Sequence, residues 1–240
     1  MSRELALRLP DLPRWVEVRS LLSSGHCEIY GFTDGSEPSL IVRDPDGGDI
    51  FVIGSPTKAA LDTAVEQNVD DGLVIAPAEQ TAELAQFLRG WTATPATLHT
   101  LSDPHRLPTR APGAVRFLDP MLIGRLSLPA ELTDELESGA RNSAIAAAFV
   151  DEQPVAFCYA GATTESYWDI AIDTLPEYRR RGFAARCVTH MIQYMGVQGK
   201  QPIWGSAHDN PPSWQLARKL GFVAVDELVL FERRSATTAE

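Results

Sequence analysis

The sequence predicts an α/β (α+β) protein built from two similar halves, each a mixed, mostly antiparallel sheet flanked by helices. Three observations lead to this prediction. The 240 residues are enough for two domains of ordinary size. Short runs of branched and aromatic residues alternate with segments of helical periodicity. Both halves place these segments in the order strand, strand, strand, helix, strand, helix, strand, although the residues themselves are not detectably alike.

In the first half the expected elements are separated by glycine, proline and asparagine, which often interrupt strands and helices. Strands are expected at 27–32, 40–43, 50–53, 73–75 and 91–101, and helices at 56–67 and 79–88. Ser55 is the expected cap of the first of these helices. A proline-rich stretch at 102–113 predicts a connection, so the two halves are expected at 1–112 and 113–240.

The second half opens with an expected helix at 128–139, which has acidic residues early, where the helix dipole favours them. Strands follow at 144–150, 154–160, 166–172, 202–206 and 222–231. One helix begins near Ala184 and ends at Gly196 or Gly199. Another helix is opened by Asn210 as the cap and by Pro211 in the first turn.

Composition excludes several classes of protein. The chain has 21 Lys and Arg against 32 Asp and Glu, a net charge of −11, so neither nucleic acid nor an anionic membrane is an expected partner. Three widely spaced cysteines favour neither a disulfide framework nor a metal site. The first residues lack the apolar core of a signal peptide, and we therefore expect a cytoplasmic protein.

One basic segment stands out against this acidic background. Arg179, Arg180 and Arg181 precede Gly182 at the expected start of a helix. A helix N-terminus offers unpaired backbone N–H groups and the positive end of the helix dipole, which suit a phosphate or pyrophosphate. An R-x-x-G-x-A pattern alone is more typical of a solvated basic turn that caps a helix.

A second segment makes the pattern more specific. Residues 174–179 read T-L-P-E-Y-R and run into R-R-R-G-F-A at 179–184, and residues 210–222 fit N-x-x-S-x-x-L-x-x-K-L-G-F. Together these segments resemble the GNAT superfamily of acyl-CoA-dependent N-acetyltransferases over roughly residues 144–233. The weaker pattern of the first half resembles the tandem branch of that superfamily, in which one copy has lost its cofactor site.

The resemblance implies acetyl-CoA as cosubstrate and no metal. Its pyrophosphate would lie on the amides of residues 179–184, and its pantetheine arm beside the strand that precedes them. The implied cofactor-binding residues are Ile172, Thr174, Arg179, Arg180, Arg181, Gly182, Phe183, Ala184 and Asn210. Asn210 is equally explained as a plain helix cap. The corresponding turn of the first half has no arginine run and places Pro56 where backbone N–H groups are needed, so only the second half is expected to bind the cofactor.

The implied reaction is direct attack of a primary amine of a small molecule or amino acid on the thioester. Such a reaction needs a base, an oxyanion site and an acid. Ala217 stands where many relatives have a tyrosine acid. Asp169, Glu165 and His208 are the candidate catalytic residues, and each is also explained as an exposed polar loop or edge residue.

Two other hypotheses stay open at this point. The absence of the tyrosine fits a non-catalytic acyl-CoA-binding or regulatory protein. The arginine segment also fits an α/β protein whose loop binds another phosphate ligand, or none.

Overall fold

The computed structural model describes residues 1–33, 38–67, 72–108 and 115–233. The predicted boundary between residues 112 and 113 lies outside the described residues. The predicted order of elements is confirmed in both halves. The first half contains α1 (Ser2–Arg8), α2 (Val16–Ser24), β1 (Glu28–Thr33), β2 (Ser39–Arg43), β3 (Ile50–Ile53), α3 (Lys58–Glu66), β4 (Val74–Pro77), α4 (Thr81–Phe87) and β5 (Trp91–Leu101).

The second half shows the same order after one further strand and a helix. Its elements are β6 (Val115–Phe117), α5 (Ala130–Asn142), β7 (Ala146–Val150), β8 (Gln153–Thr163), β9 (Tyr167–Thr174), α6 (Phe183–Val197), β10 (Gln201–Ala207), α7 (Pro211–Lys219) and β11 (Phe222–Arg233). The sequence analysis did not predict α1, α2 or β6. These elements are nine residues long or shorter, so they carry little periodic pattern.

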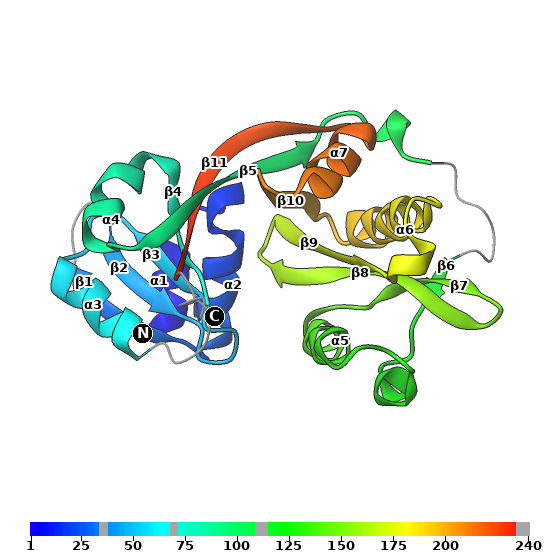
Figure 1. The fold of residues 1–240 in the computed structure, drawn as a ribbon, viewed down its shortest axis with the longest axis horizontal. Helices are drawn as coiled ribbons and strands as arrows, with labels where there is room; N and C mark the ends of the chain where they lie inside the picture. The colour runs from blue at the N-terminus through cyan, green and yellow to red at the C-terminus, as the bar shows by residue number, and fades with distance from the viewer. Residues whose placement is uncertain (34–37, 68–71, 109–114, 234–240) are drawn as a thin grey trace, which may run out of the picture. The chain divides into compact units, whose positions relative to one another are not determined.

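The structure divides into two compact units, and the first holds most of the N-terminal half (Figure 1). Its strands follow the order β1-β2-β3-β4-β11-β5, with β3 and β4 parallel and the pairs β1–β2, β2–β3 and β4–β11 antiparallel. Neighbouring residues of β2 point to opposite faces of the sheet. Ile41 packs with Leu61 of α3 and Leu84 of α4, whereas Leu40 packs with Leu22 of α2.

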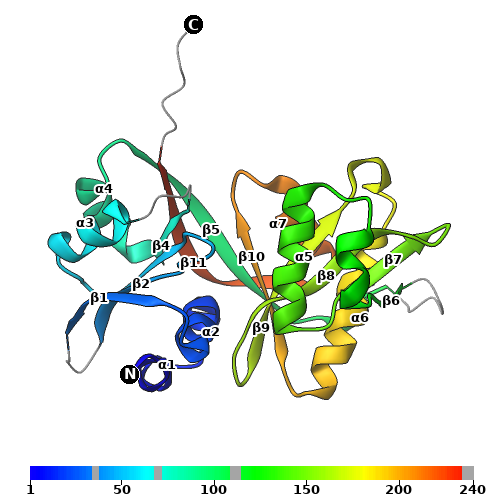
Figure 2. The same cartoon turned by 90° about the horizontal axis from the view of Figure 1, so that it is seen from below.

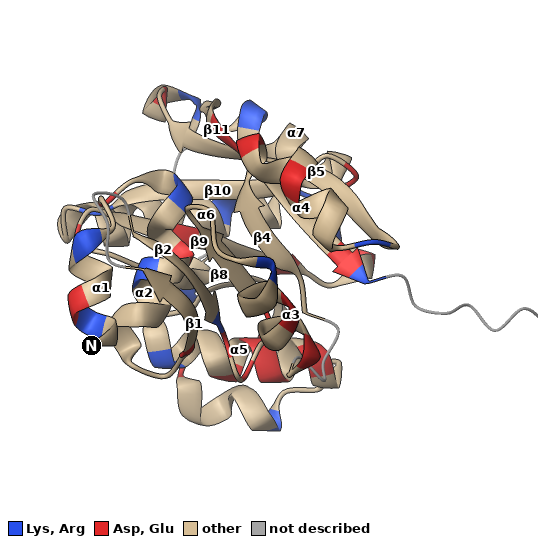
Figure 3. Cartoon of the chain, turned by 90° about the vertical axis from the view of Figure 1, so that its left-hand side faces the viewer, with Lys and Arg blue, Asp and Glu red and all other residues tan. Residues whose placement is uncertain are grey.

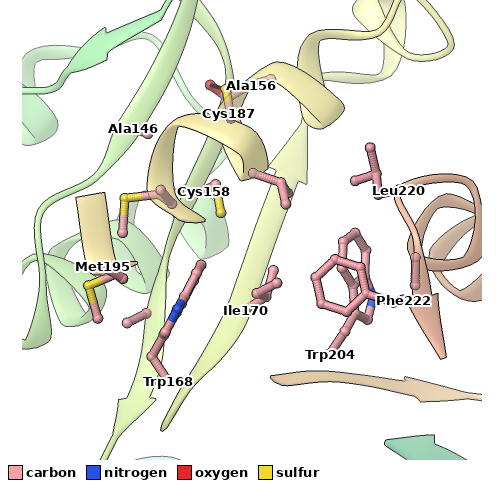
Figure 4. Close-up of a cluster of buried hydrophobic side chains, with 14 of the residues drawn as sticks. Ala146, Ala156, Cys158, Trp168, Ile170, Cys187, Met195, Trp204, Leu220 and Phe222 are labelled. Atoms are coloured by element: carbon pink, nitrogen blue, oxygen red, sulfur yellow. Dashed lines mark hydrogen bonds between the residues drawn. The ribbon is translucent and has the colours of Figure 1, made fainter. Parts of the chain in front are cut away.

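The second unit contains a sheet ordered β5-β10-β9-β8-β7-β6, in which only the described pair β9–β10 is recorded as parallel. Helix α6 covers one face of its central strands and α5 the other (Figures 1 and 2). The face under α6 has small side chains on β7 and β8, which allow the helix to approach closely. These are Ala146, Ala148, Ala156, Cys158 and Ala160. Figure 4 shows Cys158, Trp168 and Ile170 on this side of the sheet, with Met195 of α6 close by.

The two units do not coincide with the two halves of the sequence. The first unit takes up Ser206–Trp214 and the chain from Val225 on, and the second takes up the chain from His99. Within the first unit β11 pairs with β4, so that Val229 lies opposite Ala76. Each unit therefore contains residues from both sides of position 112.

Candidate active site

The connection from β9 to α6 is shaped by three special positions. A 3-10 turn at Pro176–Tyr178 follows β9, with its proline at the first position. Arg180 and Gly182 then adopt left-handed backbone conformations, with φ of 59° and 82°. Gly182 is the N-terminal cap of α6 and supplies no side chain to the first amides of the helix. These amides are therefore left for an external acceptor, as an anion-binding helix start requires.

The three arginines of this loop are all exposed, and two of them make side-chain contacts that hold the loop. The Nε of Arg179 donates a hydrogen bond of 3.0 Å to the carbonyl oxygen of Thr174, which closes the turn across its ends. The guanidinium carbon of Arg181 lies 5.4 Å from the centre of the Tyr178 ring. A Cβ built on Gly182 meets nothing within 4 Å, so the described chain leaves open space at the helix start.

The matching turn of the first unit is closed in a different way. Helix α3 is capped by Thr57, whose side-chain oxygen accepts a hydrogen bond from the amide of Ala60. The predicted cap, Ser55, is wrong because α3 begins at Lys58, three residues further along. A side-chain hydroxyl thus accepts a hydrogen bond from a backbone amide at the start of α3, whereas no side chain accepts one at the start of α6.

In the strand that leads into this loop, β9, pairing with the neighbouring strand β10 covers only the first part of the strand. The register of β9 and β10 pairs Tyr167 with Gln201, Trp168 with Pro202 and Asp169 with Ile203. No further pair between these two strands is recorded in the described chain, although β9 continues to Thr174 and β10 to Ala207. Ile172 and Thr174 lie in the part of β9 beyond the last pair. A strand that has lost one neighbour can pair its backbone with an extended ligand.

Asp169 lies at the last paired position, where the two strands part. Its carboxylate projects from the face opposite Trp168 and Ile170, which point into the core beneath α6 (Figure 4). The side chain is partly accessible at the surface, but protein atoms surround it densely enough for desolvation to raise the pKa of Asp169 to about 7. A carboxyl group with a pKa near neutrality is suited to general base catalysis.

The other candidate residues lie elsewhere. Glu165 is exposed in the turn between β8 and β9. His208 belongs to the first unit, where its Nε2 lies 2.8 Å from Thr97 Oγ1 and its amide donates to the carbonyl of Pro95. Asn210 belongs to the same unit and caps α7, because its Oδ1 accepts from the amide of Ser213 at 3.4 Å. The structure thus joins Asp169, Ile172 and Thr174 to the arginine loop through one strand, whereas His208 and Asn210 belong to the other unit.

Ala217 is a core residue. Its side chain is fully buried in the cluster that contains Trp204, Leu220 and Phe222. Trp204 and Phe222 meet edge to face there, with ring centres 5.3 Å apart (Figure 4). The position therefore contributes packing and supplies no proton donor.

Sequence reasoning missed three ionisable residues on the side of the sheet that carries Asp169. Asp173 lies on the same face of β9 as Asp169, and the alternation of side chains along a strand would have been enough to predict this position. Tyr159 lies opposite Ala171 on β8, and Glu135 lies on α5. No sequence signal could have found these two residues, because their positions depend on the hairpin register and on helix packing. Among the described residues no group of three or more histidine, cysteine or acidic side chains has the arrangement of a metal site.

Comparison with known proteins agrees with this arrangement. Residues 137–231 match the GNAT acetyltransferase family. No curated protein matches the sequence. The similarity to GNAT acetyltransferases is thus one of family sequence over residues 137–231 and one of fold along the chain.

Solved structures share the fold along nearly the whole chain. A GCN5-related N-acetyltransferase-like protein from Streptococcus suis has a TM-score of 0.73 at 20% identity, covering 97% of this chain and 98% of that one. A GNAT acetyltransferase from Colwellia psychrerythraea has a TM-score of 0.58 at 12% identity, covering 97% and 96%. A tandem GNAT protein from the clavulanic acid biosynthesis pathway has a TM-score of 0.58 at 13% identity, covering 92% and 88%.

None of the helices in the described part of the chain combines the length and the hydropathy of a membrane-spanning segment.

Proposed function

We propose that the chain transfers the acetyl group of acetyl-CoA to a primary amine of a small molecule or amino acid by direct attack. The observation that carries this proposal is that one strand, β9, connects an unpaired strand edge with a helix start that no side chain caps. Strand β9 parts from β10 at Asp169 and ends at Thr174. Eight residues further on, after the arginines, the chain reaches the uncapped start of α6 at Gly182. GNAT acetyltransferases use acetyl-CoA, and both features fit that cosubstrate.

The fit is chemical as well as geometric. The pyrophosphate would accept hydrogen bonds from the first amides of α6 and lie beside Arg180 and Arg181. The pantetheine arm would pair with the backbone of Ile172 and its neighbours, beyond the last β10 partner. Because Thr57 already caps α3, the turn at 53–58 lacks these features, and we assign the cosubstrate to residues 113–240 and not to residues 1–112.

In the reaction, Asp169 would remove a proton from the acceptor ammonium group, so that the amine nitrogen attacks the thioester carbon. The new C–N bond forms, the C–S bond breaks, and the nitrogen loses its second proton as the departing thiolate takes up one, so that the products are the amide and free CoA thiol. Ala217 does not supply this proton because it is an apolar core residue. A pKa near 7 allows Asp169 to be ionised at neutral pH and still accept a proton.

The test is thiol release from acetyl-CoA across a panel of primary amines and amino acids. The proposal requires thiol release that depends on both substrates and that falls at least about 100-fold in Asp169→Asn, as expected for loss of a general base. Glu165→Gln is the matched control, because it removes an exposed carboxylate from the adjacent turn. Equal rates in Asp169→Asn and wild type would remove Asp169 from the mechanism.

A second candidate function is acyl-CoA binding without catalysis, which the burial of Ala217 favours. Here acetyl-CoA would stabilise the protein against thermal unfolding, and no amine would release thiol. Arg179→Ala addresses both functions, because it removes the bond that closes the loop on Thr174. Unchanged stabilisation by acetyl-CoA in that variant would exclude the loop as the binding site.

A further inference from the structure

Strand β8 carries an irregularity directly opposite Asp169. The recorded pairing of β8 with β9 skips two residues of β8, Gly161 and Ala162, but only one residue of β9, Asp169. An extra residue of this kind is a β-bulge, which bends a strand and redirects side chains, and bulges are frequent beside active sites. Asp169 is one of the two acidic residues of β9, and Figure 3 colours such residues red. Because Asp169 is also the last residue paired with β10, the pairing of β9 changes on both sides at this one residue.

The end of α5 holds the bulge in place. Asn142, the last residue of α5, donates a hydrogen bond of 3.2 Å from its side-chain amide to the carbonyl oxygen of Gly161. Ser143, which follows it, accepts a hydrogen bond of 2.8 Å at its hydroxyl oxygen from the backbone amide of Ala160. A bulge disrupts the hydrogen bonds between strands, and here side chains from outside the strand pair bind the backbone beside it. The bulge is therefore a fixed feature of the second unit.

The bulge presents bare backbone next to the carboxylate. Gly161 is exposed and Asp169 is partly exposed. A Cβ built on Gly161 would lie 3.4 Å from Asp169 Oδ2 and 3.8 Å from the Cβ of Ala171, so a longer side chain would start beside the carboxylate. Further along the same face the surface is already filled, because Tyr159 lies opposite Ala171 with its ring against Gly139 of α5. Gly161 thus leaves open an approach to Asp169 that a side chain would cover.

The fold itself accommodates a larger residue at position 161. The φ of Gly161 lies outside the left-handed region, and both contacts of the added Cβ have ordinary van der Waals distances. Gly139 differs, because a Cβ there would overlap the Tyr159 ring, and Gly221 differs, because its φ is 92°. Glycine inside a strand weakens the strand, since it has no side chain to pack, and it often marks a place where a ligand approaches closely.

We propose that Gly161 sets the size of the acceptor that reaches Asp169. The amine approaches Asp169 across the bare backbone of Gly161, and the carbon that carries the amine nitrogen lies where a side chain at position 161 would otherwise stand. The site therefore takes primary amines with a bulky group next to the nitrogen, and a side chain at position 161 excludes them before it excludes small amines. The inference rests on the proposed function, in which Asp169 is the base.

The first test measures access to Asp169 without acetyl transfer. The full chain is treated with a water-soluble carbodiimide and glycinamide, which convert an accessible carboxyl group into an amide, and peptide mass spectrometry measures the labelling of Asp169. Gly161→Leu should lower this labelling at least about fivefold, because the leucine must move before the reagents reach the carboxylate. Gln153→Leu adds the same side chain at an exposed position of the same strand and should leave the labelling unchanged. Glu165, an exposed carboxylate of the adjacent turn, is the internal reference and should be labelled equally in every variant.

Gly161→Ala is the second variant, and it should lower the labelling of Asp169 by less than Gly161→Leu does. Urea midpoints measured on each variant separate a loss of labelling from a loss of folding. Equal labelling of Asp169 in wild type, Gly161→Ala and Gly161→Leu would overturn the proposal. An Asp169 that is not labelled in the wild-type protein would overturn it as well.

The second test is thiol release from acetyl-CoA with ethylamine and with 1-phenylethylamine, measured separately. Gly161→Leu should lower kcat/KM for 1-phenylethylamine at least about tenfold more than for ethylamine, and it should leave the KM for acetyl-CoA unchanged. Equal losses for the two amines would refute the size role, as would a wild-type protein that acetylates ethylamine alone. Protection of Asp169 in Gly161→Leu without thiol release from any amine refutes the transferase function and retains Gly161 as the residue that keeps Asp169 open.

Discussion

Two glycines of α6 provide a sharp test of the loop that starts this helix. Gly182 caps the helix with φ of 82°, and Gly196 lies within its last turns. A Cβ built on either glycine meets nothing within 4 Å, so replacement by alanine creates no clash at either position. The two substitutions therefore differ in backbone conformation and in little else.

The expected magnitudes follow from that difference. An L-residue in the left-handed region costs about 1–2 kcal/mol, so Gly182→Ala should lower the free energy of unfolding by about that amount. Gly196→Ala replaces glycine within a helix and should raise the free energy of unfolding by about 0.5–1 kcal/mol. Urea unfolding followed by circular dichroism measures both changes as shifts of the midpoint in opposite directions.

The same pair of variants tests the binding role. If alanine moves the backbone out of the left-handed region, the conformation that presents the α6 amides becomes a minor one. A cost of about 1.4 kcal/mol corresponds to a tenfold loss of affinity, so acetyl-CoA should bind Gly182→Ala about tenfold more weakly and Gly196→Ala unchanged. Equal acetyl-CoA affinities of the two variants would refute the reasoning that the Gly182 conformation forms the binding site.

Four further predictions address the rest of the molecule. Folding raises the pKa of Asp169 to about 7, so the protonated carboxyl group stabilises the folded state at low pH, and this stability should be lost as the pH rises from about 4 to 7. Urea midpoints measured across this range should therefore fall with pH in the wild type, and Asp169→Asn should not show this fall. In the same window the acetylation rate should rise with pH, because the ionised carboxylate is the base; a rate independent of pH would exclude this role. Gly139→Ala should lower the free energy of unfolding by about 1–3 kcal/mol, because the added Cβ would overlap the Tyr159 ring. The control Ser138→Ala, at the exposed neighbouring position, should change the free energy of unfolding by no more than about 0.5 kcal/mol. Phe231→Ala should lower the free energy of unfolding by about 3–5 kcal/mol, since this β11 side chain is 1% exposed in the core of the first unit; a change under 1 kcal/mol would show that β11 is dispensable there.

The fold was largely predictable because local signals agreed with one another. The hairpin of β7 and β8 was predicted from two apolar runs around a short polar turn, and Asp151 and Glu152 form that turn with positive φ. Asn210 before Pro211 marked the start of α7 correctly. By contrast, the pairing of β11 with β4 depends on contacts more than 100 residues apart, for which no local pattern exists. The same limit applies to the site, where the arginine loop was evident from adjacent residues but the approach of Glu135 and Tyr159 to Asp173 was not.

The central claim is that acetyl-CoA binds at the start of α6, and thermal unfolding with and without acetyl-CoA tests it most directly. At a hundredfold excess over its dissociation constant, acetyl-CoA should stabilise the wild-type protein by about 2.7 kcal/mol. Gly196→Ala should show the same stabilisation, and at that acetyl-CoA concentration Gly182→Ala should show about half of it. A wild-type protein whose unfolding temperature does not change with acetyl-CoA, or a Gly182→Ala variant stabilised as fully as wild type, would contradict the claim.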